Sequence, residues 1–209
     1  MPIDWPELLK PSHTAIVINE MQVGIVGDQA SLPELAKAVR ETGIVPRLAR
    51  LLDIARANGV RVCHCPALKR PDGLGNPLNT PLTAGLAQRG QAMASGSRRS
   101  DIIPELAPKA EDVVCGRYFG MQGFQESGLD GFLRAFGIKT VIVAGVSTNI
   151  GVLGTAMGAV DRGYKAVIAT DCVAGTPLDY HEAVLRNTLR FLAWTTTAEA
   201  IAKAWSATW

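Results

Sequence analysis

The chain has 209 residues, 47% of them hydrophobic, and a formal net charge of +2. This length and apolar content can bury the core of one globular domain, so we expect a single domain over residues 1–209. Lys and Arg occur singly or in pairs, which argues against a nucleic-acid-binding surface. No apolar run is long enough to span a membrane and no signal-peptide pattern opens the chain, so we expect a cytoplasmic protein without membrane or nucleic-acid partners.

Apolar runs and helical periodicities alternate along the first half of the chain. Residues 14–19 (TAIVIN) have the composition of a buried strand, and residues 32–42 and 44–58 have helical patterns. Residues 60–65 (VRVCHC) predict a second strand. From 66 to 100 the pattern gives way to Pro, Gly, Asn and polar residues, which is typical of a functional loop, a lid or an oligomer contact.

The second half continues the alternation of strands and helices. We predict short or regular elements over residues 101–106 (helix entry), 113–115 (strand), 129–136 (helix), 140–163 (strand, turn and helix), 166–170 (strand ending at Asp171), 180–192 (helix), 195–197 (edge strand) and 198–205 (helix). Strands and helices that alternate in this way predict a doubly wound parallel α/β sheet with right-handed crossovers.

Residues 140–163 carry the most distinctive pattern. The strand is apolar at every position, as a parallel sheet covered on both faces requires, and it bends at Gly145. Ser147, Thr148 and Asn149 pass through the bend into a helix, whose free N–H groups suit an anion or an oxyanion. In the simpler alternative, one of these three side chains only caps the helix.

The cysteines and histidines do not form a convincing metal site. Each of the four cysteines sits in or beside an apolar run and is expected to be a reduced core residue. In Cys63-His64-Cys65 alternate side chains of a strand point to opposite faces, and no second ligand cluster follows. His13, His64 and His181 are expected to be structural or solvated. We therefore predict no metal and no cofactor.

Four segments in order resemble one family. They are I-N-E-M-Q (18–22), residues 113–124 with Arg-Tyr and a later Phe, G-V-S-T-N-I-G-V-L-G-T-A (145–156) and residues 163–171. Together they resemble the isochorismatase-like, or cysteine hydrolase, superfamily. The resemblance implies a three-layer α/β/α sandwich around a mainly parallel sheet of about six strands, a homo-oligomer (dimer or tetramer), and a cis peptide bond between Val146 and Ser147.

The same resemblance shows three departures. Amidohydrolases of this family use an Asp, a Lys and a nucleophilic Cys, whereas Glu20 stands here at the place of the Asp. Cys115 or Gly116 falls at the place of the Lys, with Arg117 as the nearest cation. Gly151 stands at the place of the nucleophile, so the covalent thioester route is closed at that position.

A mechanism without a nucleophilic side chain remains possible. Isochorismatases, as the resemblance implies, carry Gly near this place and cleave a vinyl ether by protonating it from a carboxylic acid. Glu20 is the candidate acid or base, because burial disfavours a charged carboxyl group and no Lys is present to oppose this. The alternative is that Glu20 caps backbone N–H groups or pairs with Arg117.

The remaining candidates each have a functional and a structural interpretation. Arg117 either grips a substrate carboxylate or neutralises Glu20. Gln22 either touches substrate or forms structural hydrogen bonds, and Tyr118 and Phe119 either wall the pocket or join the core. Cys115 beside Arg117 is either a displaced nucleophile with a lowered pKa or a small buried residue.

The hypothesis that follows is a hydrolase without a cysteine nucleophile, acting on a small anionic metabolite. Glu20 is its acid or base, Arg117 supplies charge, and the turn from Ser147 to Gly151 anchors the substrate. Two alternatives stay open. One is a catalytically inactive descendant that serves as a ligand-binding protein or scaffold, since all three catalytic positions differ together, and the other is catalysis by Cys115.

Overall fold

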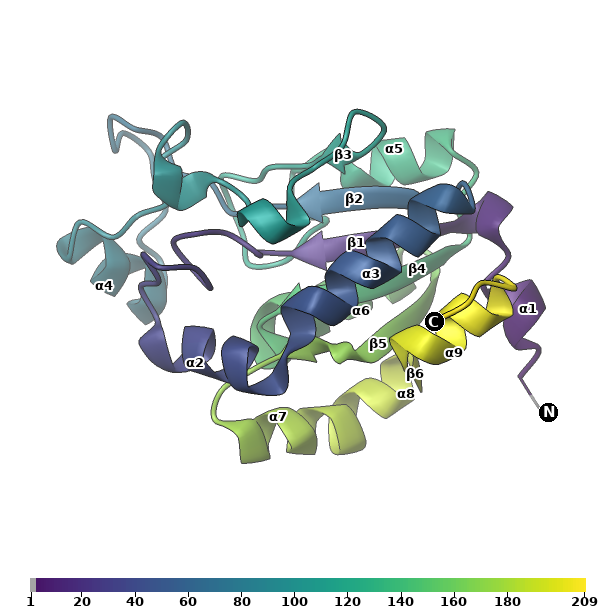
Figure 1. The fold of residues 1–209 in the computed structure, drawn as a ribbon. Helices are drawn as coiled ribbons and strands as arrows, with labels where there is room; N and C mark the ends of the chain where they lie inside the picture. Colours follow the sequence, from purple (N-terminus) through teal and green to yellow (C-terminus); the bar gives the residue numbers. More distant parts are fainter. Residues whose placement is uncertain (1–2) are drawn as a thin grey trace.

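The computed structural model describes residues 3–209 and contains one parallel sheet of six strands in the order β3-β2-β1-β4-β5-β6 (Figure 1). The strands are β1 (Thr14–Asn19), β2 (Arg61–Cys65), β3 (Val113–Val114), β4 (Thr140–Val146), β5 (Lys165–Ala174) and β6 (Trp194–Thr196). The predicted α/β class and parallel sheet of about six strands are confirmed.

Helices flank this sheet on both faces. The α-helices are α1 (Trp5–Leu8), α2 (Pro33–Thr42), α3 (Ile44–Ala57), α4 (Pro81–Gln88), α5 (Leu129–Ala135), α6 (Leu153–Asp161), α7 (Leu178–Val184), α8 (Arg190–Leu192) and α9 (Ala198–Ala204). Short π-helical segments, η4 (Thr148–Val152) and η5 (Leu185–Leu189), lead into α6 and α8, and 3₁₀ turns occur at η1 (Pro11–His13), η2 (Arg98–Ser100) and η3 (Pro104–Leu106).

The alternation of side chains along the buried strands builds two cores. In β1, Ile16 and Ile18 join the core under α2, α3 and α9, whereas Ala15 and Val17 join the core under α5, α6 and α7. Successive side chains of a strand point to opposite faces, so a strand that is buried on both sides must be apolar throughout. This arrangement is the predicted three-layer α/β/α sandwich.

Two elements differ from the prediction. Helix α4 was not predicted, because Pro81 and Gly85 weaken the helical pattern; it is stabilised by a capping box in which Thr80 Oγ1 accepts from Thr83 N at 3.1 Å. Strand β5 continues past Asp171 to Ala174, whereas the predicted strand ends at residue 170. The register between β4 and β5 shifts, which lets pairing resume after the polar residues.

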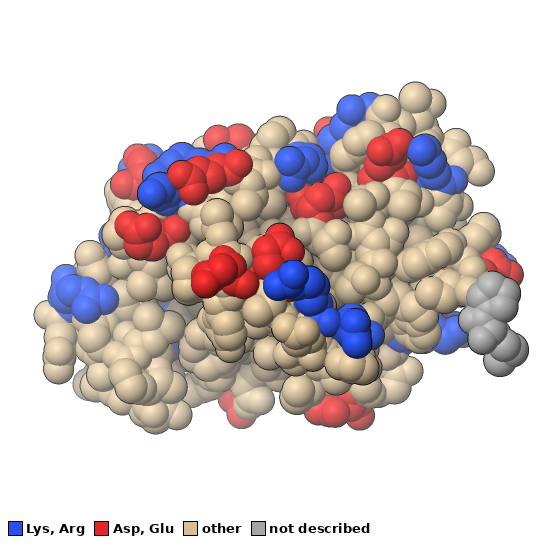
Figure 2. Space-filling view, turned by 90° about the horizontal axis from the view of Figure 1, so that it is seen from below, with Lys and Arg blue, Asp and Glu red and all other residues tan. Residues whose placement is uncertain are grey.

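The carboxyl ends of β1 and β2 point toward α4 and the loops of residues 66–100, which lie beyond that edge of the sheet (Figure 1). Ligands of open α/β sheets bind in the crevice at this edge. On the face shown in Figure 2, acidic and basic side chains are interspersed without a single-sign patch. Within residues 3–209, none of the helices has the length and apolarity needed to cross a membrane.

Candidate active site

A cavity of about 140 Å³ lies at the carboxyl edge of the sheet. Its wall contains three charged side chains, Glu20, Lys69 and Arg117. The rest is mostly apolar and comes from the loop after β1, the start of α2, the 66–93 segment with α4, and the residues after β4. The cavity is therefore an apolar chamber with charge concentrated in one small group of residues.

Glu20 and Arg117 meet in this cavity. Glu20 follows β1 directly, with a positive φ of 53°, and its amide donates to the carbonyl oxygen of Cys65 at 3.3 Å. Arg117 is held by backbone hydrogen bonds to Pro66 and Leu68, and its Nη2 donates to Glu20 Oε1. Sequence analysis left open whether Arg117 reaches Glu20, and the structure shows that it does. The pair is the contact of the interpretation in which Arg117 neutralises Glu20.

The Arg117 guanidinium is only partly used. The residue is 3% exposed, yet its Nε and Nη1 have no hydrogen-bond partner among the residues that the structure describes. Buried polar groups are normally paired because an unpaired one loses its water without compensation. Two guanidinium nitrogens therefore lie buried without a hydrogen-bond partner among the described residues.

Lys69 is the charged residue that sequence analysis missed. It lies in residues 66–100, for which the sequence predicts an irregular loop. Its Nζ donates to the carbonyl oxygen of Tyr118 at 3.0 Å. Burial, and then the positive charge of Arg117, lower the pKa of Lys69. A single Lys in a Pro- and Gly-rich stretch carries no periodic signal, so only the fold brings it to Glu20.

The turn after β4 places some of its predicted residues at the cavity and others elsewhere. Ser147 and Ile150 line the cavity, and the Val146–Ser147 peptide bond is cis. Thr148 is buried, and its Oγ1 lies 2.7 Å from His181 Nδ1. Asn149 and Gly151 are not among the lining residues.

Gly151 is enclosed by backbone. A Cβ at this position would lie 2.8 Å from the carbonyl oxygen of Val146. That distance is shorter than a normal carbon–oxygen contact, so a side chain here requires the backbone to shift.

Three other candidates have structural contacts. Gln22 is fully buried; its Nε2 donates to the carbonyl oxygens of Ala67 and Ser100, both at 2.9 Å, and its Oε1 accepts from Ala67 N. It therefore fastens the loop after β2 to the loop after β1. Tyr118 and Phe119 are partly exposed and do not line the cavity, although Tyr118 contributes its carbonyl oxygen to Lys69.

Cys115 lacks the environment of a reactive thiol. It is 1% exposed, and burial raises its pKa to about 11, opposite to the lowered value considered above. A thiol must be ionised to act as a nucleophile, so burial disfavours this role. The pKa of Cys63 is likewise raised to about 12 by burial.

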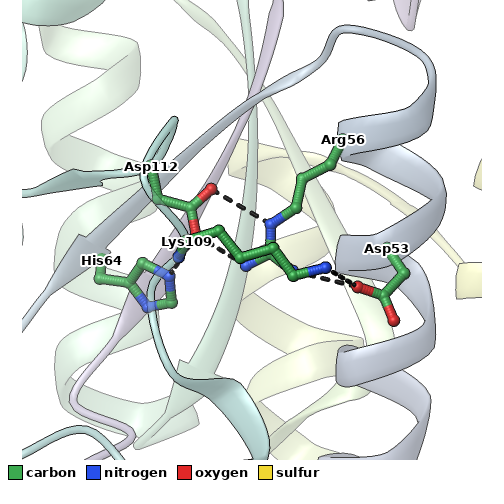
Figure 3. A network of polar contacts seen from close by, with 5 residues as sticks. All are labelled: Asp53, Arg56, His64, Lys109 and Asp112. Atoms are coloured by element: carbon green, nitrogen blue, oxygen red, sulfur yellow. Dashed lines mark hydrogen bonds and ion pairs between the residues drawn. The ribbon is translucent and has the colours of Figure 1, made fainter.

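His64 belongs to a separate polar network (Figure 3). Its Nε2 lies 3.4 Å from Asp112 Oδ2, and Asp112 also accepts from Arg56 and from Lys109 N. Cys63 and Cys65 pack in the core on the other side of β2. Residues 3–209 contain no cluster of three or more His, Cys, Asp or Glu placed to hold a metal ion.

These features define a class of protein: a three-layer α/β protein with a charged cavity at the carboxyl edge of a parallel sheet. The family model described as Isochorismatase domain matches residues 14–200. The chain belongs to the isochorismatase family.

Relatives and solved structures agree with this assignment. The chain is 29% identical to the ureidoacrylate amidohydrolase RutB of Methylobacterium radiotolerans over an alignment of 215 residues. The alignment covers 95% of this chain and 82% of that protein. A cysteine hydrolase from Pseudomonas syringae pv. phaseolicola has a TM-score of 0.78 and 25% identity, with 94% of each chain covered. N-carbamoylsarcosine amidase from Thermoplasma acidophilum has a TM-score of 0.70 and 26% identity, over 90% of this chain and 97% of that one.

Proposed function

We propose that this protein is a hydrolase of a small anionic metabolite that works without a cysteine nucleophile and uses Glu20 as its acid–base group. The observation that carries the proposal is the position of the Glu20 carboxylate in the cavity, beside Arg117 and near Lys69. Relatives named as amidohydrolase and amidase support hydrolysis of a small molecule.

Arg117 holds the Glu20 side chain in place by donating to its Oε1. A carboxylate at this position can take a proton from water. In this proposal Glu20 activates a water molecule for attack and then returns the proton to the leaving group. Gly151 contributes no atom to the reaction, and Ser147 lies on the cavity wall beside the substrate.

Arg117 and Lys69 bind the anionic part of the substrate. Their two positive charges exceed the single negative charge of Glu20 by one, which matches a monoanion. Both side chains lie on the cavity wall, where they face this part of the substrate. No metal or cofactor takes part in this proposal.

The test is a hydrolysis screen of vinyl ethers, small amides and small esters with the wild type and Glu20→Gln. We expect kcat to fall by about 10²–10⁴-fold in Glu20→Gln, because the amide cannot accept the proton. Glu105→Gln, at an exposed position outside the cavity, serves as the matched control and should keep full activity. Activity that survives in Glu20→Gln removes Glu20 from the mechanism.

A second candidate is a ligand-binding descendant without catalysis. One observation favours it. Among the described residues Glu20 is the only carboxylate on the cavity wall, and it already forms an ion pair with Arg117. In that case a ligand bound to the wild type is recovered unchanged. Robust turnover of any compound in the screen excludes this candidate.

We also propose that the chain forms a homo-oligomer. Large apolar side chains are exposed on α6 to β6, namely Met157, Val160, Tyr180, Phe191 and Trp194. Such side chains are typical of surfaces that another protein covers. Light scattering coupled to size-exclusion chromatography measures the mass; a monomer at micromolar concentration contradicts the proposal.

A further inference from the structure

The cavity offers more positive donor groups than its own residues use. Arg117 is almost fully buried, and Nε and Nη1 have no partner among the described residues. Lys69 makes one contact, to the carbonyl oxygen of Tyr118. Arg117 and Lys69 both line the cavity, so an anionic ligand there lies beside two positively charged side chains. The planar fork of a guanidinium matches the two oxygens of a carboxylate.

The rest of the cavity suits an apolar tail. The large apolar side chains of its wall come from five separate segments: Ile25, Leu32, Leu35, Leu78, Leu82, Leu86, Met93, Met121 and Ile150. An apolar cavity of about 150 Å³ is large enough to bind benzene. The 140 Å³ cavity therefore has room for a ligand of about six non-hydrogen atoms, its charged group included.

We propose that the site selects monocarboxylates with a short apolar tail. The carboxylate binds to Arg117 and Lys69, and the tail lies between the start of α2 and helix α4. This inference rests on the proposed function and specifies its substrate class. The surplus of one positive charge favours a monoanion over a dianion such as phosphate.

Isothermal titration of the wild type at pH 7 with butanoate, hexanoate, octanoate and decanoate tests the tail. Each buried methylene should tighten binding by about fourfold until the chamber is full, after which affinity levels off. Hexan-1-ol and hexylammonium test the charge, and both should bind at least tenfold more weakly than hexanoate. Affinity that is independent of chain length, or equal affinity for hexylammonium, overturns the inference.

Two substitutions locate the subsites. Lys69→Met should weaken all carboxylates by about tenfold, because a charge-assisted hydrogen bond is lost. Leu82→Ala enlarges the chamber and should move the preference to longer chains without changing butanoate. Leu74→Ala is the matched control, since Leu74 is 69% exposed in the same segment and does not line the cavity. Unchanged hexanoate binding in Lys69→Met contradicts the inference.

The fold of each variant is checked by thermal unfolding. Lys69 and Leu82 are only partly buried, so both variants should remain folded.

The inference and the proposed function fail in different ways. Binding of free carboxylic acids needs no turnover, so a protein that binds hexanoate selectively and hydrolyses nothing contradicts the proposed function alone. Hydrolysis of uncharged substrates at rates that Lys69→Met and Leu82→Ala leave unchanged contradicts this inference alone.

Discussion

Two arginine–carboxylate pairs lie beside strand β2, and they are built differently. Arg56 holds Asp112 through two hydrogen bonds, Nε to Oδ1 at 3.2 Å and Nη2 to Oδ2 at 2.7 Å, and its Nη1 donates to Asp53. Figure 3 shows Lys109 and His64 completing the network. Arg117, by contrast, donates to Glu20 through Nη2 alone.

The difference separates a structural pair from one that is open to a ligand. Every nitrogen of the Arg56 guanidinium donates to a carboxylate, so this pair has little capacity for another molecule. Arg117 retains two unpaired nitrogens and lines a cavity. Arg56 is therefore saturated with carboxylate partners, whereas Arg117 lines a cavity that holds space for a ligand.

The largest expected effect comes from removing each arginine in turn. Arg56→Met leaves the Asp112 side chain, which is 1% exposed, with only Lys109 N and His64 as partners, and it should lower the free energy of unfolding by about 3–5 kcal/mol. Arg117→Met leaves Glu20, which is 18% exposed on a cavity wall, and should cost less stability while abolishing carboxylate binding.

Urea unfolding measures the two stabilities. Asp53→Ala is the control for the Arg56 network, because Asp53 is 65% exposed and its loss should cost less than about 1 kcal/mol. Equal losses of stability in Arg56→Met and Arg117→Met would show that the two pairs play the same structural part.

The second effect concerns the backbone under the cavity. Gly151→Ala places a Cβ 2.8 Å from the Val146 carbonyl oxygen and should destabilise the fold by about 1–3 kcal/mol. Gly151→Cys should cost as much and should restore no thiol-dependent hydrolysis, because the fold gives the side chain no space. Thermal unfolding measures the cost, and iodoacetamide-sensitive activity in Gly151→Cys would disprove the second part.

These residues show what sequence patterns can and cannot locate. The apolar runs of β1 and β4 predict two buried strands of the sheet, and Glu20 follows from its place at the end of β1. Lys69 and α4 escaped prediction, because their segment has no periodicity and its position depends on contacts distant in sequence. For Gln22 the sequence allows either substrate contact or structural hydrogen bonds. In the structure its amide donates to the carbonyl oxygens of Ala67 and Ser100, which lie in the loop that covers the cavity edge of the sheet.

The third effect is a loss of ligand binding in alkali. The pKa of Lys69 is lowered, so its ammonium is lost as pH rises through a value below the ordinary 10.5. Hexanoate affinity should then fall by about tenfold, to the level of Lys69→Met, whose own affinity should not decline over that range. Calorimetric titrations from pH 7 to 10 measure this, and parallel pH profiles for the two proteins would exclude Lys69 from the carboxylate subsite.

The smallest effect should be a loss of stability in acid, through His64 beside the Arg56–Asp112 pair. Burial lowers the pKa of His64 against the opposing pull of Asp112, and burial also lowers that of His181. The unfolded chain then binds protons that the folded chain does not, so the free energy of unfolding decreases as pH falls below about 6.5. His64→Gln removes one of these groups and should flatten the slope between pH 6.5 and 5 in urea titrations, whereas an unchanged slope would mean that His64 titrates alike in both states. Burial and Asp112 act in opposite directions on the pKa of His64, so this change in stability should be the smallest of those predicted here. The two pairs therefore respond to opposite ends of the pH range. Acid lowers the free energy of unfolding through His64, and alkali lowers ligand affinity through Lys69.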